Sequence, residues 1–239
     1  MKGNLLRRLC RERWAGRRAY SPPVSSAAAV AQKTRAFKYA LVGVCGYVFY
    51  EWQTALTSAS KRRYMLEHYT CSSRHLQEGR GYTLLTSVFS HKEAWHLAAN
   101  LVTITSFADI CIPVVGLSCT TAVFVLGGVT GALAQVMRSR ANGRHELVLG
   151  ASGGACAMTM LAACLMPKAP VQLMFVIPGR AMALIGALGL YDLGAEVLHI
   201  NDGIAHVGHL GGMGVGLAAY ALLRTPFAGR IGRARMLAK

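Results

Sequence analysis

Charged residues, and acidic ones above all, are scarce in this sequence. Only 15% of its 239 residues are charged, against roughly 25% in a typical soluble domain. Asp and Glu number 10 against 26 Lys and Arg, while 53% of the residues are hydrophobic. This shortage of charge, with a mean hydropathy of +0.35, favours a protein that lies in a bilayer over a soluble one.

The sequence also lacks paired cysteine motifs, and it lacks a cluster of aromatic and basic side chains on which nucleic-acid bases could stack. The 7 cysteines form an odd set without a Cys-x-x-Cys pair, which argues against a disulfide scaffold or a zinc site. Most of the net charge of +16 lies in the tails, because residues 1–38 carry ten bases and one acid, and residues 224–239 carry five bases and no acid. Such tails are typical of contact with anionic lipid or of a targeting signal. We therefore expect a lipid bilayer as partner, no nucleic acid, no metal and no cofactor.

Residues 1–37 have the composition of a mitochondrial transit peptide, since they are rich in Arg and contain one acid. Within them, Arg18-Ala19-Tyr20-Ser21 resembles a matrix-processing site with cleavage after Tyr20. A basic disordered segment is the alternative interpretation. Residues 225–239 are expected to form a basic C-terminal tail, so the folded domain is predicted to cover residues 38–224.

Long uncharged runs between the tails predict an all-α membrane protein with six transmembrane helices. Asp109 and Pro113–Gly116 are expected to divide one run that is too long for a single helix. The polar residues 57–82 are expected to form a loop outside the hydrocarbon. Lys and Arg are nearly balanced between the two sides, so the positive-inside rule gives no orientation. The six spans are expected at 38–56, 88–110, 117–137, 148–166, from about 180 to 195, and 204–223.

One serine stands among glycines at the expected start of the fourth span, in Gly150-Ala151-Ser152-Gly153-Gly154. Glycines let another helix or a substrate backbone come close. A serine at a helix start also has free backbone N–H groups beside it, which can stabilise an oxyanion. Taken alone, the motif favours a small-residue packing contact over an activated nucleophile.

The last span carries two histidines, His206 and His209, beside a face of small residues. Gly208, Gly212 and Gly216 recur every four residues and therefore share that face. Histidines inside an uncharged span are costly. A neutral imidazole can take the proton of a serine and return it to a leaving amine, so one of the two histidines is a candidate general base. Hydrogen bonding between helices is the alternative.

A third polar group lies in the second span, where His96 and Asn100 are four residues apart and so share one helix face. Both can donate hydrogen bonds to a developing negative oxygen, and interhelical hydrogen bonding is again the alternative. The three groups together supply a serine, a base and oxyanion donors on three separate spans. A metal site made of His96, His206 and His209 is less favourable, because no carboxylate cluster accompanies them.

These motifs, His-x-x-x-Asn, Gly-x-Ser-Gly and Gly-His-Leu-Gly-Gly, together resemble the rhomboid intramembrane serine proteases. Residues 84–100 and Leu149–Gly154 are particularly similar to the mitochondrial, presenilin-associated rhomboid-like branch. The resemblance covers about residues 37–224. It implies that Ser152 is the nucleophile and His209 the general base of a dyad without an acidic third member. His209 is preferred over His206 because glycines follow it three and seven residues later, as in the family pattern.

The resemblance also implies the remaining parts of the site and the biological setting. His96, Asn100 and the backbone N–H of Ser152 would bind the oxyanion. The glycines expected near the site are Gly150, Gly153, Gly212 and Gly216. The implied function is that of a serine endopeptidase which cleaves transmembrane protein substrates, as a multi-pass protein of the mitochondrial inner membrane. No cofactor is implied.

Two features depart from the family, and two other functions fit parts of the sequence. Mitochondrial members often carry an extra span before the six-helix core, which we do not find, and their Trp-Arg pair in the first loop has no clear match in residues 57–82. Gly150–Gly154 also fits the Gly-x-Ser-x-Gly nucleophile elbow of soluble α/β-hydrolases, and Asp192 or Asp202 before His209 would give the order Ser, Asp, His of their catalytic triad. That alternative is rejected because a soluble hydrolase needs charged amphipathic helices over its sheet, whereas the segments here have long uncharged runs and no polar face. The other alternative is a non-catalytic rhomboid-like scaffold.

Overall fold

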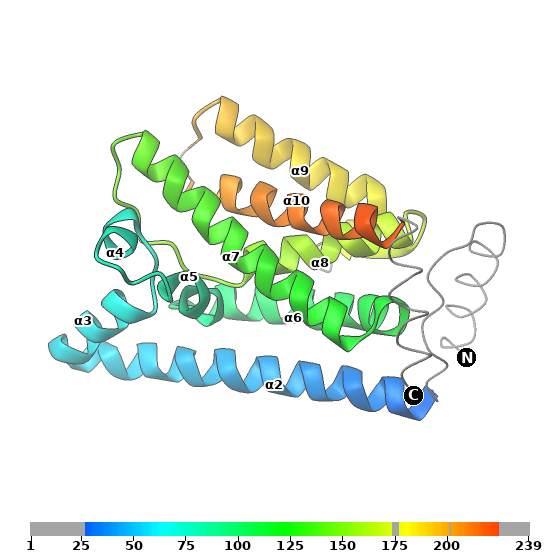
Figure 1. Cartoon of the computed structure of the whole chain (residues 1–239), viewed down its shortest axis with the longest axis horizontal. Coiled ribbons are helices and arrows are strands. Elements are labelled where there is room, and N and C mark those ends of the chain that lie inside the picture. The colour runs from blue at the N-terminus through cyan, green and yellow to red at the C-terminus, as the bar shows by residue number, and fades with distance from the viewer. Residues whose placement is uncertain (1–26, 174–176, 201, 225–239) are drawn as a thin grey trace.

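The structure is a computed structural model that describes residues 27–173, 177–200 and 202–224. In this part of the chain six helices are 14 residues or longer, and they pack side by side as a bundle (Figure 1). Their bounds are α2 Ala27–Thr54, α6 Ala94–Val115, α7 Leu117–Ala141, α8 Ser152–Leu165, α9 Ala181–Val197 and α10 His206–Leu223. Residues 1–26 of the expected targeting segment and the tail at 225–239 lie outside the described residues.

The long helices correspond to the six expected spans, with different ends. α2 begins at Ala27 rather than at residue 38, and Thr34 and Phe37 are already buried within it. α6 runs through Asp109 and Pro113, so the helix does not break at these two residues. It ends at Gly116, the last residue of the expected break, whose φ of +85° is readily adopted only by glycine.

Residues 57–82 are not an open loop but contain two short helices, α3 (Ala59–His68) and α4 (Ser73–Gln77). Serine hydroxyls cap both, since Ser58 accepts from the backbone N–H of Lys61 and Ser72 from that of His75. The 3-10 turn η1 (Ala55–Thr57) precedes α3. The helix α5 (Thr83–Thr86) and the 3-10 turn η2 (Ser87–Phe89) connect α4 to α6.

An antiparallel hairpin joins α8 to α9 and is made of β1 (Pro170–Leu173) and β2 (Ile177–Arg180). It lies where Pro and Lys residues end the apolar run of α8. The next helix then begins at Ala181, close to the expected start of the fifth span.

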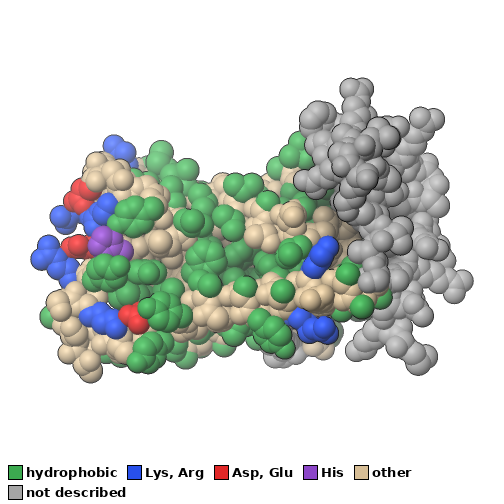
Figure 2. All heavy atoms as spheres, turned by 60° about the horizontal axis from the view of Figure 1, so that its bottom comes forward, with side chains coloured by type: hydrophobic (Ala, Val, Ile, Leu, Met, Phe, Trp, Pro, Cys, Tyr) green, Lys and Arg blue, Asp and Glu red, His purple; other side chains and the backbone are tan. Residues whose placement is uncertain are grey.

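The distribution of side chains is that of a helix bundle with an apolar belt. In the described residues, α6 and α7 are long and apolar enough to cross a membrane by length and composition. The outer helices α2 and α9 expose large apolar side chains, such as Tyr39, Tyr47, Leu190 and Val197. Figure 2 shows hydrophobic side chains over the middle of one face, and most of its charged side chains at the end that carries α3 and α4.

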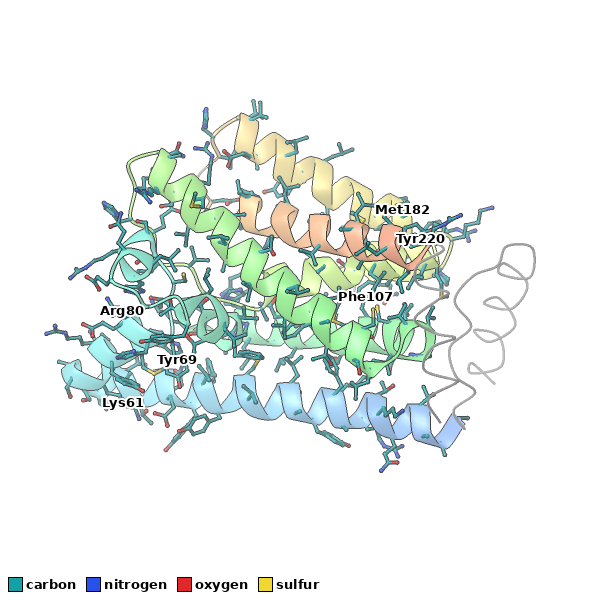
Figure 3. The ribbon with its side chains drawn as sticks, viewed as in Figure 1. Lys61, Tyr69, Arg80, Phe107, Met182 and Tyr220 are labelled. Carbon is teal, nitrogen blue, oxygen red and sulfur yellow. The ribbon has the colours of Figure 1, made fainter. Side chains whose placement is uncertain are left out.

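The two ends of the bundle differ in chemistry. Lys61, Tyr69 and Arg80 lie at the end with α3 and α4, whereas Phe107, Met182 and Tyr220 lie toward the opposite end (Figure 3). At the first end Lys61 pairs with Glu51 at 2.7 Å. Elsewhere an ion pair joins two long helices, since Lys38 Nζ of α2 lies 2.7 Å from Asp109 of α6.

α8 is the central helix of the bundle, in contact with α6, α7, α9 and α10. Apart from Ser152, Met160 and Cys164, all of its residues are buried. Many of its side chains are small (Ala, Gly and Cys), so the neighbouring helices approach its backbone closely. The fold therefore places the serine motif at one end of its most enclosed helix.

Candidate active site

Ser152 is the first residue of α8, as the glycine-rich motif predicted. The earliest helical hydrogen bond there is donated by the N–H of Ala155 to the carbonyl of Ala151, at 2.9 Å. The N–H groups in the first turn therefore have no carbonyl partner inside the helix. Gly150, with φ +121°, turns the chain sharply just before the serine. Ser152 thus stands at a helix start with backbone donors beside it.

The segment that leads to Ser152 is held by the polar end of the bundle. Cys71 and Val148 exchange two backbone hydrogen bonds of 2.8 Å, and the N–H of Gly150 donates to the carbonyl of Ser87 at 2.9 Å. The N–H of Ala151 donates to His91 Nε2 at 3.2 Å. Three successive attachments therefore fix the backbone up to the residue before the serine.

Glycines bring α10 against the start of α8. A Cβ added at Gly212 would lie 2.1 Å from the carbonyl oxygen of Gly153, and one at Gly216 would lie 2.2 Å from that of Ala157. A Cβ at Gly131 of α7 would lie 2.6 Å from the carbonyl oxygen of Gly208. Any side chain at these positions would force the helices apart. The glycine face predicted from the sequence is therefore the face on which α7, α8 and α10 meet.

His209 lies one turn before Gly212 on α10 and is partly buried, with 18% of its side chain exposed. Its Nδ1 is 3.2 Å from Asp192 Oδ1. Because a carboxylate only accepts, Nδ1 carries the hydrogen and Nε2 of a neutral ring is left free to accept a proton. Within the described residues no hydrogen bond joins Ser152 to His209, although both lie near the ends of helices that pack against each other.

Asp192 belongs to this site, although the sequence analysis considered it only as the acid of the rejected α/β-hydrolase alternative. It lies on α9, is fully buried, and contacts both His206 and His209 through the same oxygen, Oδ1. The expectation of no acidic group beside the histidine therefore differs from the structure. The available signal was a lone carboxylate in an apolar span, which by its cost points to a function.

His96 and Asn100 occupy neighbouring positions near Ser152. A Cβ added at Gly150 would lie 2.7 Å from Cε1 of His96, so that ring covers the glycine. The amide of Asn100 is buried and donates to the backbone carbonyl of His96 at 3.0 Å and to His91 Nε2 at 3.2 Å. Both amide hydrogens of Asn100 are thus engaged, whereas the ring of His96 has no hydrogen-bond partner among the described residues.

His91 is a second residue that the sequence analysis did not assign. Its Nε2 accepts from the N–H of Ala151 and from Asn100, so the hydrogen of the neutral ring is on Nδ1. Nδ1 is buried and has no partner in the described part of the chain. His91 therefore joins the serine segment to Asn100, and two acceptor contacts fix its tautomer.

Two cavities adjoin these residues. One of about 20 Å³ lies directly beside Ser152, between Gly131, Gly150 and Gly208, and such a volume holds roughly one water molecule. The other is an open cavity of about 700 Å³ at the polar end, bordered by His96, His206 and the salt-bridged residues Arg138 and Glu196. The larger cavity thus opens at the polar end beside His96 and His206, and neither Ser152 nor His209 lines it.

The part of the chain that matches known proteins contains the candidate site. The rhomboid domain model matches residues 78–226. RHOMBOID-like protein 12, mitochondrial, of Arabidopsis thaliana is 28% identical over 180 residues, which cover 68% of this chain and 52% of that protein.

Two further relatives give similar coverage. Rhomboid protein 1, mitochondrial, of Saccharomyces cerevisiae is 27% identical over 75% of this chain and 51% of its own length. The presenilin-associated rhomboid-like protein, mitochondrial, of Bos taurus is 29% identical over 70% and 43%. The chain thus matches about half the length of these curated relatives. Since the domain model covers more than half of the sequence and includes every candidate residue from His91 to Gly216, this chain belongs to the rhomboid family.

Proposed function

We propose that this protein is an intramembrane serine endopeptidase whose nucleophile is Ser152 and whose general base is His209. One observation carries the proposal. The glycine contact between Gly153 and Gly212 brings the start of α8, where the serine lies, against the turn of α10 that follows the histidine. Asp192 supports it, because its contact with Nδ1 leaves the other ring nitrogen of His209 available as a base.

In the first half of the reaction His209 Nε2 takes the hydroxyl proton of Ser152 while Oγ attacks the carbonyl carbon of the scissile peptide bond. The carbonyl oxygen becomes an oxyanion, which the N–H groups at the start of α8 and the side chains of His96 and Asn100 stabilise. Asn100 must exchange one of its present hydrogen bonds to do so. His209 then returns the proton to the leaving amine, and an acyl-enzyme ester remains on Ser152.

In the second half a water molecule loses a proton to His209 and attacks the ester carbonyl. The ester bond breaks, the carboxylic acid product leaves, and Ser152 Oγ recovers the proton from His209. A site for such a water is offered by the cavity of about 20 Å³ next to the serine. All bonds and protons balance without a metal or cofactor.

The proposed substrates are membrane proteins that are cut in or near a transmembrane segment. A substrate helix must unwind to expose a peptide bond before that bond can reach Ser152. Six membrane spans, formed by α2 and α6 to α10, are part of the same proposal. The mitochondrial relatives and the Arg-rich residues before α2 support the mitochondrial inner membrane as the location.

The proposal is tested by labelling the purified full chain in detergent with a fluorophosphonate probe, which reacts with activated serines. Wild type is expected to be labelled and Ser152→Ala is not. Ser106→Ala, at an exposed serine of α6, is the matched control and should be labelled like wild type. Equal labelling of Ser152→Ala and wild type would refute the assignment of the nucleophile.

A second measurement separates the protease from a non-catalytic scaffold. Mitochondrial membrane proteins are compared in cells that carry wild type or Ser152→Ala, and the expected result is accumulation of uncut substrates in the variant. Unchanged processing together with an unchanged phenotype would favour the scaffold.

A further inference from the structure

His206 is the first residue of α10, and both nitrogens of its buried ring face carboxylates. Nδ1 lies 2.8 Å from Asp192 Oδ1 on α9, and Nε2 lies 3.1 Å from Asp202 Oδ1 in the segment between α9 and α10. His206 is only 4% exposed. The position that the sequence analysis considered and set aside as a base is therefore tied to the base through Asp192.

The hydrogen-bond partners determine how many hydrogens the ring carries. Carboxylates only accept, whereas a neutral imidazole has a single N–H and can satisfy one of its two neighbours. Asp202 accepts the backbone N–H of Ile204 at 2.9 Å and the hydroxyl of Tyr191 at 3.1 Å. That backbone N–H is the main reason that the pKa of Asp202 lies below its usual range. Of the two carboxylate contacts, the one with Asp192 is the shorter and the more deeply buried, because Asp192 is fully buried whereas Asp202 is exposed.

Asp192 depends on His206 for half of its hydrogen bonds. Its Oδ1 accepts from His206 and from His209, while its Oδ2 is buried and has no partner in the described residues. Without His206, a fully buried carboxylate would keep a single hydrogen bond, which is an unfavourable state. Such a carboxylate would turn toward another donor, and it would then no longer orient His209.

On the basis of the proposed function, we infer that His206 is a positioning residue, which holds Asp192 between α9 and α10 so that Asp192 orients the base His209. Asp202 and Tyr191 hold the His206 ring in place on the side away from Asp192. Asp202 contacts Nε2, and the Tyr191 ring packs edge-on against His206 with centroids 5.5 Å apart. The chain of contacts runs from the exposed Asp202 through His206 and Asp192 to His209. Both ring nitrogens of His206 face carboxylates, so in this proposal His206 takes no proton from Ser152.

The contact of His206 Nδ1 with Asp192 and that of Nε2 with Asp202 can be tested separately. An Asn amide nitrogen reaches about the position of Nδ1, and a Gln amide nitrogen reaches about that of Nε2. His206→Asn therefore keeps the donor to Asp192, and His206→Gln keeps the donor to Asp202 but removes the one to Asp192. His199→Asn is the matched control, because His199 borders the same cavity and has φ +54°, which Asn tolerates.

The first measurement is the rate constant of fluorophosphonate labelling for the full chain in detergent. His206→Gln should be slower by about 5- to 100-fold, which corresponds to one unsatisfied buried polar group. His206→Asn should lose less than His206→Gln, and His199→Asn should match wild type. In an Asp192→Asn background the His206 variants should cause no further loss, because their effect passes through Asp192. Equal losses from both His206 variants, or full losses in that background, would overturn the inference.

The second measurement is the thermal midpoint of the same variants, which does not require activity. Because His206 and Asp192 form one buried pair, the shift of the double variant His206→Gln/Asp192→Asn should be smaller than the sum of the two single shifts. Additive shifts would overturn the inference even if no variant were active. If the thermal shifts were non-additive but wild type were not labelled by the probe, the proposed function would be refuted, whereas the pairing of His206 with Asp192 would stand.

Discussion

Gly212→Ala tests whether the contact between α8 and α10 sets the geometry of the catalytic pair. The added Cβ would lie 2.1 Å from the carbonyl oxygen of Gly153, whereas ordinary contact begins at 3.4 Å, so the helices must separate by the difference, 1.3 Å. The backbone of α8 cannot rotate away as a side chain could, because the contact is with the main chain. Since His209 is one turn from Gly212 on the same helix, the imidazole moves away from Ser152 by a similar amount.

The expected loss follows from this displacement. A misplacement of about 1 Å costs roughly 10²-fold in rate, and overpacking costs about 1–3 kcal/mol of stability, less about 0.5–1 kcal/mol gained by replacing Gly with Ala in a helix. Labelling and cleavage of a transmembrane substrate in proteoliposomes measure the first quantity, and thermal unfolding in detergent measures the second. Gly214→Ala on the same helix is the control, because its added Cβ meets nothing within 4 Å. If Gly212→Ala were as active as Gly214→Ala, the contact would not determine the catalytic geometry.

Three further changes test other parts of the site and the fold. Asn100→Ala should lower kcat by about 10²–10³-fold with a smaller change in KM, because it removes one oxyanion donor; an unchanged kcat in substrate cleavage would exclude that role. Gly150→Ala should abolish labelling of the serine, because its Cβ would lie 2.7 Å from the His96 ring and its φ is +121°, whereas Gly143→Ala, with φ +67° and open space around it, should keep labelling; equal losses in both would contradict this reasoning. Lys38→Met should destabilise the protein in bilayers by leaving Asp109 unpaired, at a cost of up to about 2.5–3.5 kcal/mol for a charge in hydrocarbon, and Lys38→Met/Asp109→Leu should restore stability. No recovery in the double variant would place this ion pair outside the hydrocarbon.

The sequence predicted the arrangement of the long helices because uncharged runs and their interruptions follow from the cost of charge in lipid. It failed where a local signal competed with tertiary contacts. Asp109 and Pro113 looked like a helix break, but Lys38 pairs with the carboxylate and the helix continues to Gly116. Residues 57–82 looked like a loop because they are polar, yet α3 and α4 lie among them.

The candidate site was predicted in its motifs but not in its connections. Ser152, His209, His96 and Asn100 carry signals in short motifs, since their spacing places them on helix faces or at a helix start. Asp192 has no motif, and its role depends on how α9 packs against α10, which spacing within one segment cannot give. His91 likewise acquires its partners only when the segment before α6 folds onto the segment before α8.

The length and enclosure of α8 bear on how the protein responds to its membrane. Its 14 residues span only about 21 Å, less than the roughly 30 Å of a hydrocarbon core. In the proposed six-span topology, lipid would instead contact the exposed side chains of α2 and α9, so changes in bilayer thickness would tilt these outer helices first. The backbone before Ser152 is meanwhile anchored to the polar end through Cys71 and Ser87. In that topology the depth of Ser152 would be set by its attachment to the polar end and not by the lipid, so membranes of different thickness would present substrates at different heights to an unchanged serine.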